Sequence, residues 1–135
     1  MTLLVDTSVW SLAFRRDTDA SDAHVEQLRK GLAGADTVVI TGLVLQELLQ
    51  GFSGPKAVSR ILQSFRTLPM LNPDRQDHIA AAEIRNKCRR SGVQIGTIDA
   101  LLIQLCGRYS LTLLSTDKDF IFAAQHVPFS IWAPN

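Results

Sequence analysis

Hydrophobic and polar positions along this chain follow two patterns, one typical of strands and the other of helices. Short continuous apolar runs, such as Leu3-Leu4-Val5 and Val38-Val39-Ile40, are typical of strands that are buried on both faces. Longer stretches carry an apolar residue at every third or fourth position, which predicts amphipathic helices. We expect strands near residues 3–5, 36–40, 68–71, 111–115 and 128–132. We expect helices near residues 9–14, 22–32, 43–52, 55–65, 74–90 and 98–109, and a short one after residue 119.

Residues that favour helix N-termini stand at the starts of these segments. Thr7 or Ser8, Ser21, Thr41 and Thr97 are expected to cap helices, because their hydroxyls can accept a free backbone N–H. Strands that alternate with helices predict an α/β fold, with a mostly parallel central sheet that is flanked by helices on both faces. The length of 135 residues predicts a single domain over residues 1–135.

The composition is that of an ordinary globular protein, with 46% hydrophobic residues. Its longest apolar runs are too short to cross a bilayer, and no basic leader precedes the first strand, so we expect a cytoplasmic protein without a membrane anchor. Cys88 and Cys106 lie in helical patterns without the spacing of a metal site, which predicts buried free thiols.

Four acidic residues stand where acids are uncommon. Asp6 and Asp117 each follow an apolar strand, so a parallel sheet would bring both to the same edge. Glu47 lies beside an apolar helix face, and Asp99 lies in the first turn of an apolar helix. Each also has an ordinary explanation, since Asp6 could cap a helix, Glu47 could reach solvent and Asp99 could offset a helix dipole. Asp119 could assist or replace Asp117, or begin the next helix.

Carboxylates gathered at one edge repel one another unless one is protonated or a cation lies among them. Hard oxygen ligands without nearby His or Cys favour Mg²⁺ or Mn²⁺ over zinc, and such ions suit phosphoryl chemistry. The net charge is +1, and if four of the 13 acids are pooled in one site the remainder carries 14 basic and nine acidic residues. A basic body around an acidic pocket favours a polyanionic substrate.

The order of these motifs resembles a PIN domain over essentially the whole chain. The motifs are Asp6-Thr7-Ser8 after a strand, Glu47 on an early helix, Asp99 at a late helix start, and Ser115-Thr116-Asp117-Lys118-Asp119 after another strand. The chain length is similar to that of the VapC toxins of VapBC toxin–antitoxin modules.

The resemblance implies an α/β/α sandwich, Mg²⁺-dependent endoribonuclease activity on RNA, a homodimer, and inhibition by a small VapB-like antitoxin. By position, Asp6, Glu47, Asp99 and Asp117 match the catalytic and metal-binding acids of the family, with Asp119 open as an alternative or partner for Asp117. Thr7 and Thr116 match hydroxyl positions beside the metal.

Basic residues suggest where RNA could lie. Arg15 and Arg16 follow the first helix and could contact phosphates, whereas the cluster of Lys87, Arg89 and Arg90 is explained equally well by the C-terminus of a helix.

Two other classes of function remain open. One is a PIN-like module that binds RNA or protein without catalysis. The other is a metal-dependent phosphatase or phosphoacceptor domain, although Ser8 stands where the phosphatase pattern has a second aspartate and Lys118 is poorly placed for a phosphoacceptor.

Overall fold

A computed structural model of the chain describes residues 1–15 and 22–134. The strands in these ranges are β1 (Thr2–Val5), β2 (Thr37–Thr41), β3 (Met70–Leu71), β4 (Thr112–Leu114) and β5 (Ser130–Ile131). The helices are α1 (Thr7–Phe14), α2 (Ala23–Leu32), α3 (Gly42–Gly51), α4 (Pro55–Phe65), α5 (Arg75–Arg90), α6 (Thr97–Tyr109) and α7 (Asp119–Ala123).

The strands form a five-stranded sheet in the order β3-β2-β1-β4-β5, and every neighbouring pair is parallel. β1 is the central strand, and its Leu4 pairs with Val39 of β2 on one side and with Leu113 of β4 on the other. The predicted α/β architecture with a parallel sheet is therefore confirmed. The prediction that Asp6 follows a central strand is also confirmed.

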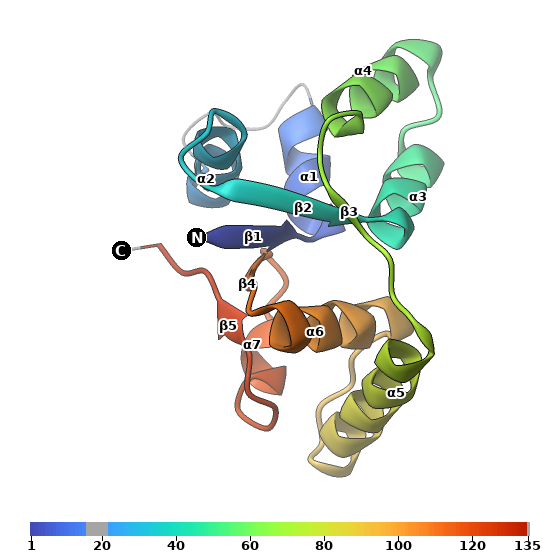
Figure 1. Cartoon of the computed structure of the whole chain (residues 1–135), viewed down its shortest axis with the longest axis vertical. Helices are drawn as coiled ribbons and strands as arrows, with labels where there is room; N and C mark the ends of the chain where they lie inside the picture. The colour runs from blue at the N-terminus through green and yellow to red at the C-terminus, as the bar shows by residue number, and fades with distance from the viewer. Residues whose placement is uncertain (16–21, 135) are drawn as a thin grey trace.

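The core lies on both faces of this sheet. Leu3, Leu4 and Val5 are all fully buried, and because successive side chains of a strand point to opposite faces, both faces of β1 must be covered. α1 to α4 gather around β2, whereas α5 to α7 lie beyond β4 (Figure 1). The central strand is thus held rigidly, and so is the residue that follows it.

The helix starts differ from the sequence expectation at three places. α1 begins at Thr7 with Asp6 as its N-cap residue, so neither Thr7 nor Ser8 caps it. The Asp22 side chain caps α2 by accepting the N–H groups of His24 and Val25, and the expected cap Ser21 lies outside the described residues. Two further N-caps are Thr41, as predicted for α3, and Gly96 instead of Thr97 for α6.

One buried acid joins α5 to α6 and could not be foreseen. Asp77 is almost fully buried, and its carboxylate accepts hydrogen bonds from the backbone N–H of Asp74, the amide of Gln104 and the guanidinium of Arg108. Burial alone would raise the pKa of Asp77, but these donors and the positive charge of Arg108 hold it below the ordinary value. This acid is therefore a structural ion-pair partner that fixes the two helices to each other.

Cys88 and Cys106 are buried free thiols, as predicted. None of the described helices combines the length and the apolar character that a membrane span requires.

Candidate metal and nucleic-acid site

The chain adds strands to one side of β1 and then to the other, because β2 and β3 lie on one side of it and β4 and β5 on the other. Open parallel sheets bind ligands at the carboxyl ends of their strands, in the crevice at such a switch of sides. Asp6 follows β1 at this point, and Asp117 follows β4, its neighbour. α3 and α6 contribute Glu47 and Asp99 to the same edge.

Asp6 is held by two serines that link β1 to the loop after β4. Its Oδ2 accepts the hydroxyls of Ser8 at 2.9 Å and of Ser115 at 2.6 Å. The same serine oxygens accept the backbone N–H groups of Thr116 and Asp117, at 3.1 and 3.0 Å. Each serine therefore donates to Asp6 and accepts from the loop, so the orientation of this nearly buried carboxylate is fixed.

Glu47 is held by the helix that follows β1. The Thr7 hydroxyl donates to Glu47 Oε1 at 2.8 Å, which joins α1 to α3 across 40 residues of sequence. Thr7 was expected beside the site, and it contacts one of the four acids. The side chain of Glu47 is half-buried, so it does not extend freely into solvent.

Asp117 and Asp119 occupy different environments. Asp117 is half-buried, and its Oδ1 accepts the backbone N–H of Asp119 at 2.9 Å. Asp119 is exposed in the first turn of α7, where a carboxylate offsets the helix dipole. The negative charge of Asp117 acts on Asp99, which is half-buried at the start of α6, and Asp119 is not among the groups that perturb it. Of the two, Asp117 is the residue whose charge acts on Asp99.

The negative charges of the acids repel one another, and this repulsion contributes to a raised pKa of Asp99. Burial, together with the negative charges of Asp6, Asp117 and Glu47, raises the pKa of Asp99 to about 6, against a weak hydrogen bond from the Gly96 N–H that lowers it. In the described ranges, none of the four acids forms an ion pair with a lysine or arginine. The cluster therefore carries negative charge without a compensating cation from these parts of the chain.

The donor set has the chemistry of a hard divalent cation site, since it consists of carboxylates and hydroxyls. Among the described residues, no group of three or more His, Cys, Asp or Glu side chains is placed so that it could hold a metal ion. Mg²⁺ does not need such a group, because it keeps several of its waters and is commonly bound through one or two carboxylates. The donor types are therefore those that a hydrated Mg²⁺ accepts, although the described side chains do not form a preformed metal site.

Ser8 and Ser115 donate to Asp6, a role that was not predicted although both residues lie in the motifs noted in the sequence. Thr116 was expected beside the metal, and it takes part through its backbone N–H. Arg15 is exposed at the C-terminal end of α1, and Arg16 lies outside the described residues, so their contact with RNA stays a prediction.

The chain is similar in sequence to an established family. The family model of the PIN domain matches residues 3–125. The chain belongs to the PIN domain family. No curated protein gives a significant sequence match.

Solved structures with the same fold include proteins described as VapBC and VapC. VapBC-1 from nontypeable Haemophilus influenzae gives a TM-score of 0.74 at 16% identity, covering 98% of this chain and 97% of that chain. VapBC2 from Rickettsia felis, bound to a DNA fragment from its promoter, gives a TM-score of 0.71 at 18% identity, covering 98% of this chain and 100% of that chain. VapC20 from Mycobacterium tuberculosis, a toxin that cleaves the sarcin–ricin loop, gives a TM-score of 0.69 at 19% identity, covering 98% of this chain and 99% of that chain. At these identities, the similarity establishes the fold.

Proposed function

We propose that this protein is a Mg²⁺-dependent endoribonuclease, the toxin of a VapBC-type toxin–antitoxin pair, whose single domain spans residues 1–135. One observation carries the proposal: the pKa of Asp99 rises to about 6 partly because the charges of Asp6, Asp117 and Glu47 act on it. Four acids from distant parts of the chain thus share one edge of the sheet. Such a cluster is typical of a cation-binding catalytic site.

Each residue has a distinct role in this proposal. Asp6, Asp99 and Asp117 hold the cation, and Glu47 holds it or orients the attacking water. Ser8 and Ser115 keep the carboxylate of Asp6 in place, and Thr7 does the same for Glu47. Thr116 and Asp119 support the loop that carries Asp117. Arg15 and Arg16 contact phosphates further along the RNA.

The reaction is hydrolysis of a phosphodiester bond, in which a water oxygen attacks phosphorus and one ester oxygen leaves. When bound, Mg²⁺ (or Mn²⁺) supplies a Lewis acid for the phosphate oxygens and makes water a better nucleophile near neutral pH. The carboxylates fix where the water and the phosphate lie relative to each other. Such positioning and electrostatic stabilisation supply most of the rate in phosphoryl transfer.

The test is cleavage of total RNA by the purified protein with Mg²⁺, with EDTA, and with the Asp99→Asn variant. Discrete products that require both the metal and Asp99 are the expected result. A parallel melting experiment reports binding directly, since Mg²⁺ should raise the melting temperature of the wild type and not of Asp99→Asn. Cleavage that persists in EDTA and in the variant would come from a contaminating ribonuclease. Folded, metal-loaded protein that cuts no RNA would refute the proposal.

The proposed partners are a small VapB-like antitoxin and a second copy of the chain, in the cytoplasm. The complexes described as VapBC among the structural neighbours support the antitoxin. Light scattering on the purified protein tests the dimer, and co-expression with the neighbouring open reading frame tests the antitoxin. A monomeric toxin that no co-expressed protein inhibits would contradict this part of the proposal.

A second candidate is a PIN-like module that binds RNA or protein without catalysis. It is favoured by the observation that, among the described residues, no group of three or more acids is placed so that it could hold a metal ion. The melting experiment distinguishes the two candidates, because a module without catalysis has no need for Mg²⁺ at Asp99.

A further inference from the structure

A cavity of about 440 Å³ opens beside the acidic site. Ser115, Thr116 and Asp117 are among its lining residues, so the cavity borders the loop that positions Asp6. Apolar residues also line it, among them Ile121 of α7 and Trp132 just after β5. The size suffices for a single nucleoside, since pockets for small ligands begin near roughly 300 Å³.

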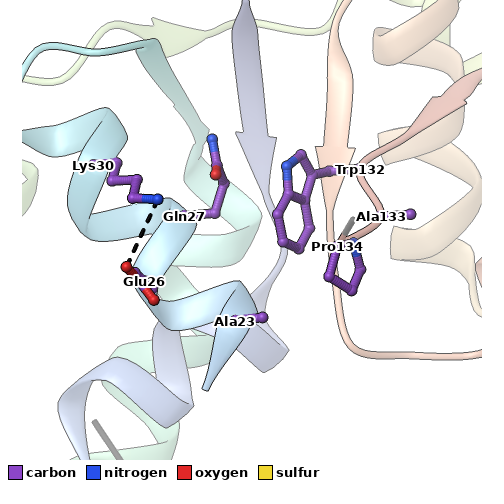
Figure 2. A pocket seen from close by; sticks show the side chains of 7 residues that line it. All are labelled: Ala23, Glu26, Gln27, Lys30, Trp132, Ala133 and Pro134. Atoms are coloured by element: carbon purple, nitrogen blue, oxygen red, sulfur yellow. Dashed lines mark ion pairs between the residues drawn. The ribbon is translucent and has the colours of Figure 1, made fainter. Parts of the chain in front are cut away.

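Trp132 is fixed relative to the acids by the sheet. Its backbone N–H donates to the carbonyl of Leu113 at 2.9 Å, so the residue is anchored on β4, the strand that leads to Asp117. His24 of α2 meets the indole edge-on, with ring centroids 5.1 Å apart. Figure 2 shows the indole standing between α2 and the C-terminal segment at Pro134. An aromatic ring anchored on β4 thus lines the same cavity as Asp117, one of the four candidate acids.

The cavity on the α2 side of the same indole is a weaker candidate. It measures about 260 Å³ and is lined by Glu26 and Lys30, which pair with each other at 3.6 Å (Figure 2). None of the four acids lines it. The cavity beside Asp117 is therefore the one that a substrate held at the acids would also reach.

We propose that the cavity beside Asp117, with the indole of Trp132 as one wall, receives an unpaired nucleobase of the nucleotide next to the phosphate at the acidic site. The inference rests on the proposed function and adds a positioning and specificity element to it. An aromatic ring offers a stacking surface to any base, which is the common way in which proteins bind unpaired nucleotides. Lys118 also lines the cavity and supplies a positive charge for the phosphate of that nucleotide. A base in a duplex is stacked on its neighbours and cannot enter.

The first test is tryptophan fluorescence in the Asp99→Asn background, which keeps the RNA intact. The chain contains two tryptophans, and the other, Trp10, is buried in the core. The Trp132→Phe variant retains Trp10 and gives the blank, so the difference between the two proteins reports Trp132 alone. A random single-stranded RNA of 12 nucleotides should quench this signal, whereas inorganic polyphosphate, which has charge and no bases, should not. Equal quenching by both, or none by RNA, would overturn the proposal.

The second test is steady-state cleavage of the same RNA by otherwise wild-type protein. Trp132→Ala should raise KM about tenfold to a hundredfold, the usual effect of losing one base–aromatic contact, with kcat changed much less. Trp132→Phe should restore most of the loss. The matched control is Phe122→Ala on α7, which removes an exposed aromatic side chain that does not line the cavity.

The outcomes separate this inference from the proposed function. If the wild type cleaves RNA and Trp132→Ala behaves like Phe122→Ala, the acidic site is catalytic and the base pocket is wrong. If the wild type cleaves no RNA, the nuclease proposal fails, and the quenching experiment still decides whether a base enters the cavity. If Trp132→Ala folds poorly, as its melting curve would show, the decision rests on two other measurements. These are the quenching of Trp132 fluorescence in the protein that keeps this residue, and the kinetics of Trp132→Phe.

Discussion

Replacing Asp99 by asparagine should stabilise the metal-free protein. A carboxyl whose pKa moves from 3.8 to about 6 becomes harder to ionise by about 3 kcal/mol. Because Asp99 is only half-buried, solvent screening reduces this, and we expect about 1–2 kcal/mol at pH 7.5. For a chain of 135 residues, this corresponds to a rise in melting temperature of roughly 3–8 °C.

The sign of the pH dependence follows from proton binding. Between pH 3.8 and about 6, the folded wild type holds a proton on Asp99 that the unfolded chain has released, so its stability falls as the pH rises through this window. Asparagine has no such dependence. The advantage of Asp99→Asn should therefore be full above pH 6 and fall to about a third of that value at pH 4.5.

Thermal unfolding by circular dichroism in EDTA and low salt measures this difference. The control is Asp119→Asn, because Asp119 is exposed and lies outside the groups that act on Asp99. It should change stability by a few tenths of a kcal/mol at most, in the unfavourable direction, through the dipole of α7. If Asp99→Asn is no more stable than the wild type at pH 7.5, or if its advantage is independent of pH, the reasoning from repulsion is wrong.

Three further outcomes are expected. The affinity for Mg²⁺, measured by calorimetry, should fall as the pH drops below about 6, because a proton then occupies Asp99; an affinity that is unchanged at pH 5 would exclude Asp99 as a ligand. Thr7→Val should leave Glu47 without its hydroxyl donor and reduce cleavage about tenfold to a hundredfold, with Thr7→Ser as the control that retains activity. Thr41→Ala should lower the free energy of unfolding by about 1 kcal/mol in a denaturant titration, because the side chain caps α3, and should leave cleavage per folded molecule unchanged.

The fold could be predicted from the sequence because its local signals agree with its tertiary environment. The run Leu3-Leu4-Val5 is apolar at every position, and only a strand covered on both faces requires that. Thr41 stands directly between an apolar strand and an apolar helix, so its role as a cap follows from local chemistry. The cap of α1 was wrong because Thr7 and Ser8 have hydroxyls that make tertiary contacts to acids, which a local pattern does not reveal.

The candidate acids could also be found from sequence, since each breaks an apolar pattern at a strand end or on a buried helix. Among their supporting groups, Thr7 was expected beside the site and does contact Glu47, whereas other partners could not be found. Ser115 donates to Asp6 across 109 residues, and Arg108 pairs with Asp77 across 31, with no local sign of either contact. Trp132 reads as part of a last strand, and only the register of β5 on β4 places it beside Asp117. Long-range partners of this kind depend on topology, which spacing along the chain does not encode.

The location of the acids explains how the cluster can exist before any cation binds. Asp6 is the N-cap residue of α1, and Asp99 lies in the first turn of α6, so each lies near the positive end of a helix dipole. Glu47 lies within α3, away from its N-terminus, and receives the Thr7 hydroxyl instead. These partial charges and donors offset part of the cost of gathering the acids, and the pKa of Asp99, raised by burial first and then by the neighbouring charges, reports the part that remains. Since that remainder is small beside the stability of a typical folded domain, the fold does not need the cation, and the uncompensated charge is left to attract one.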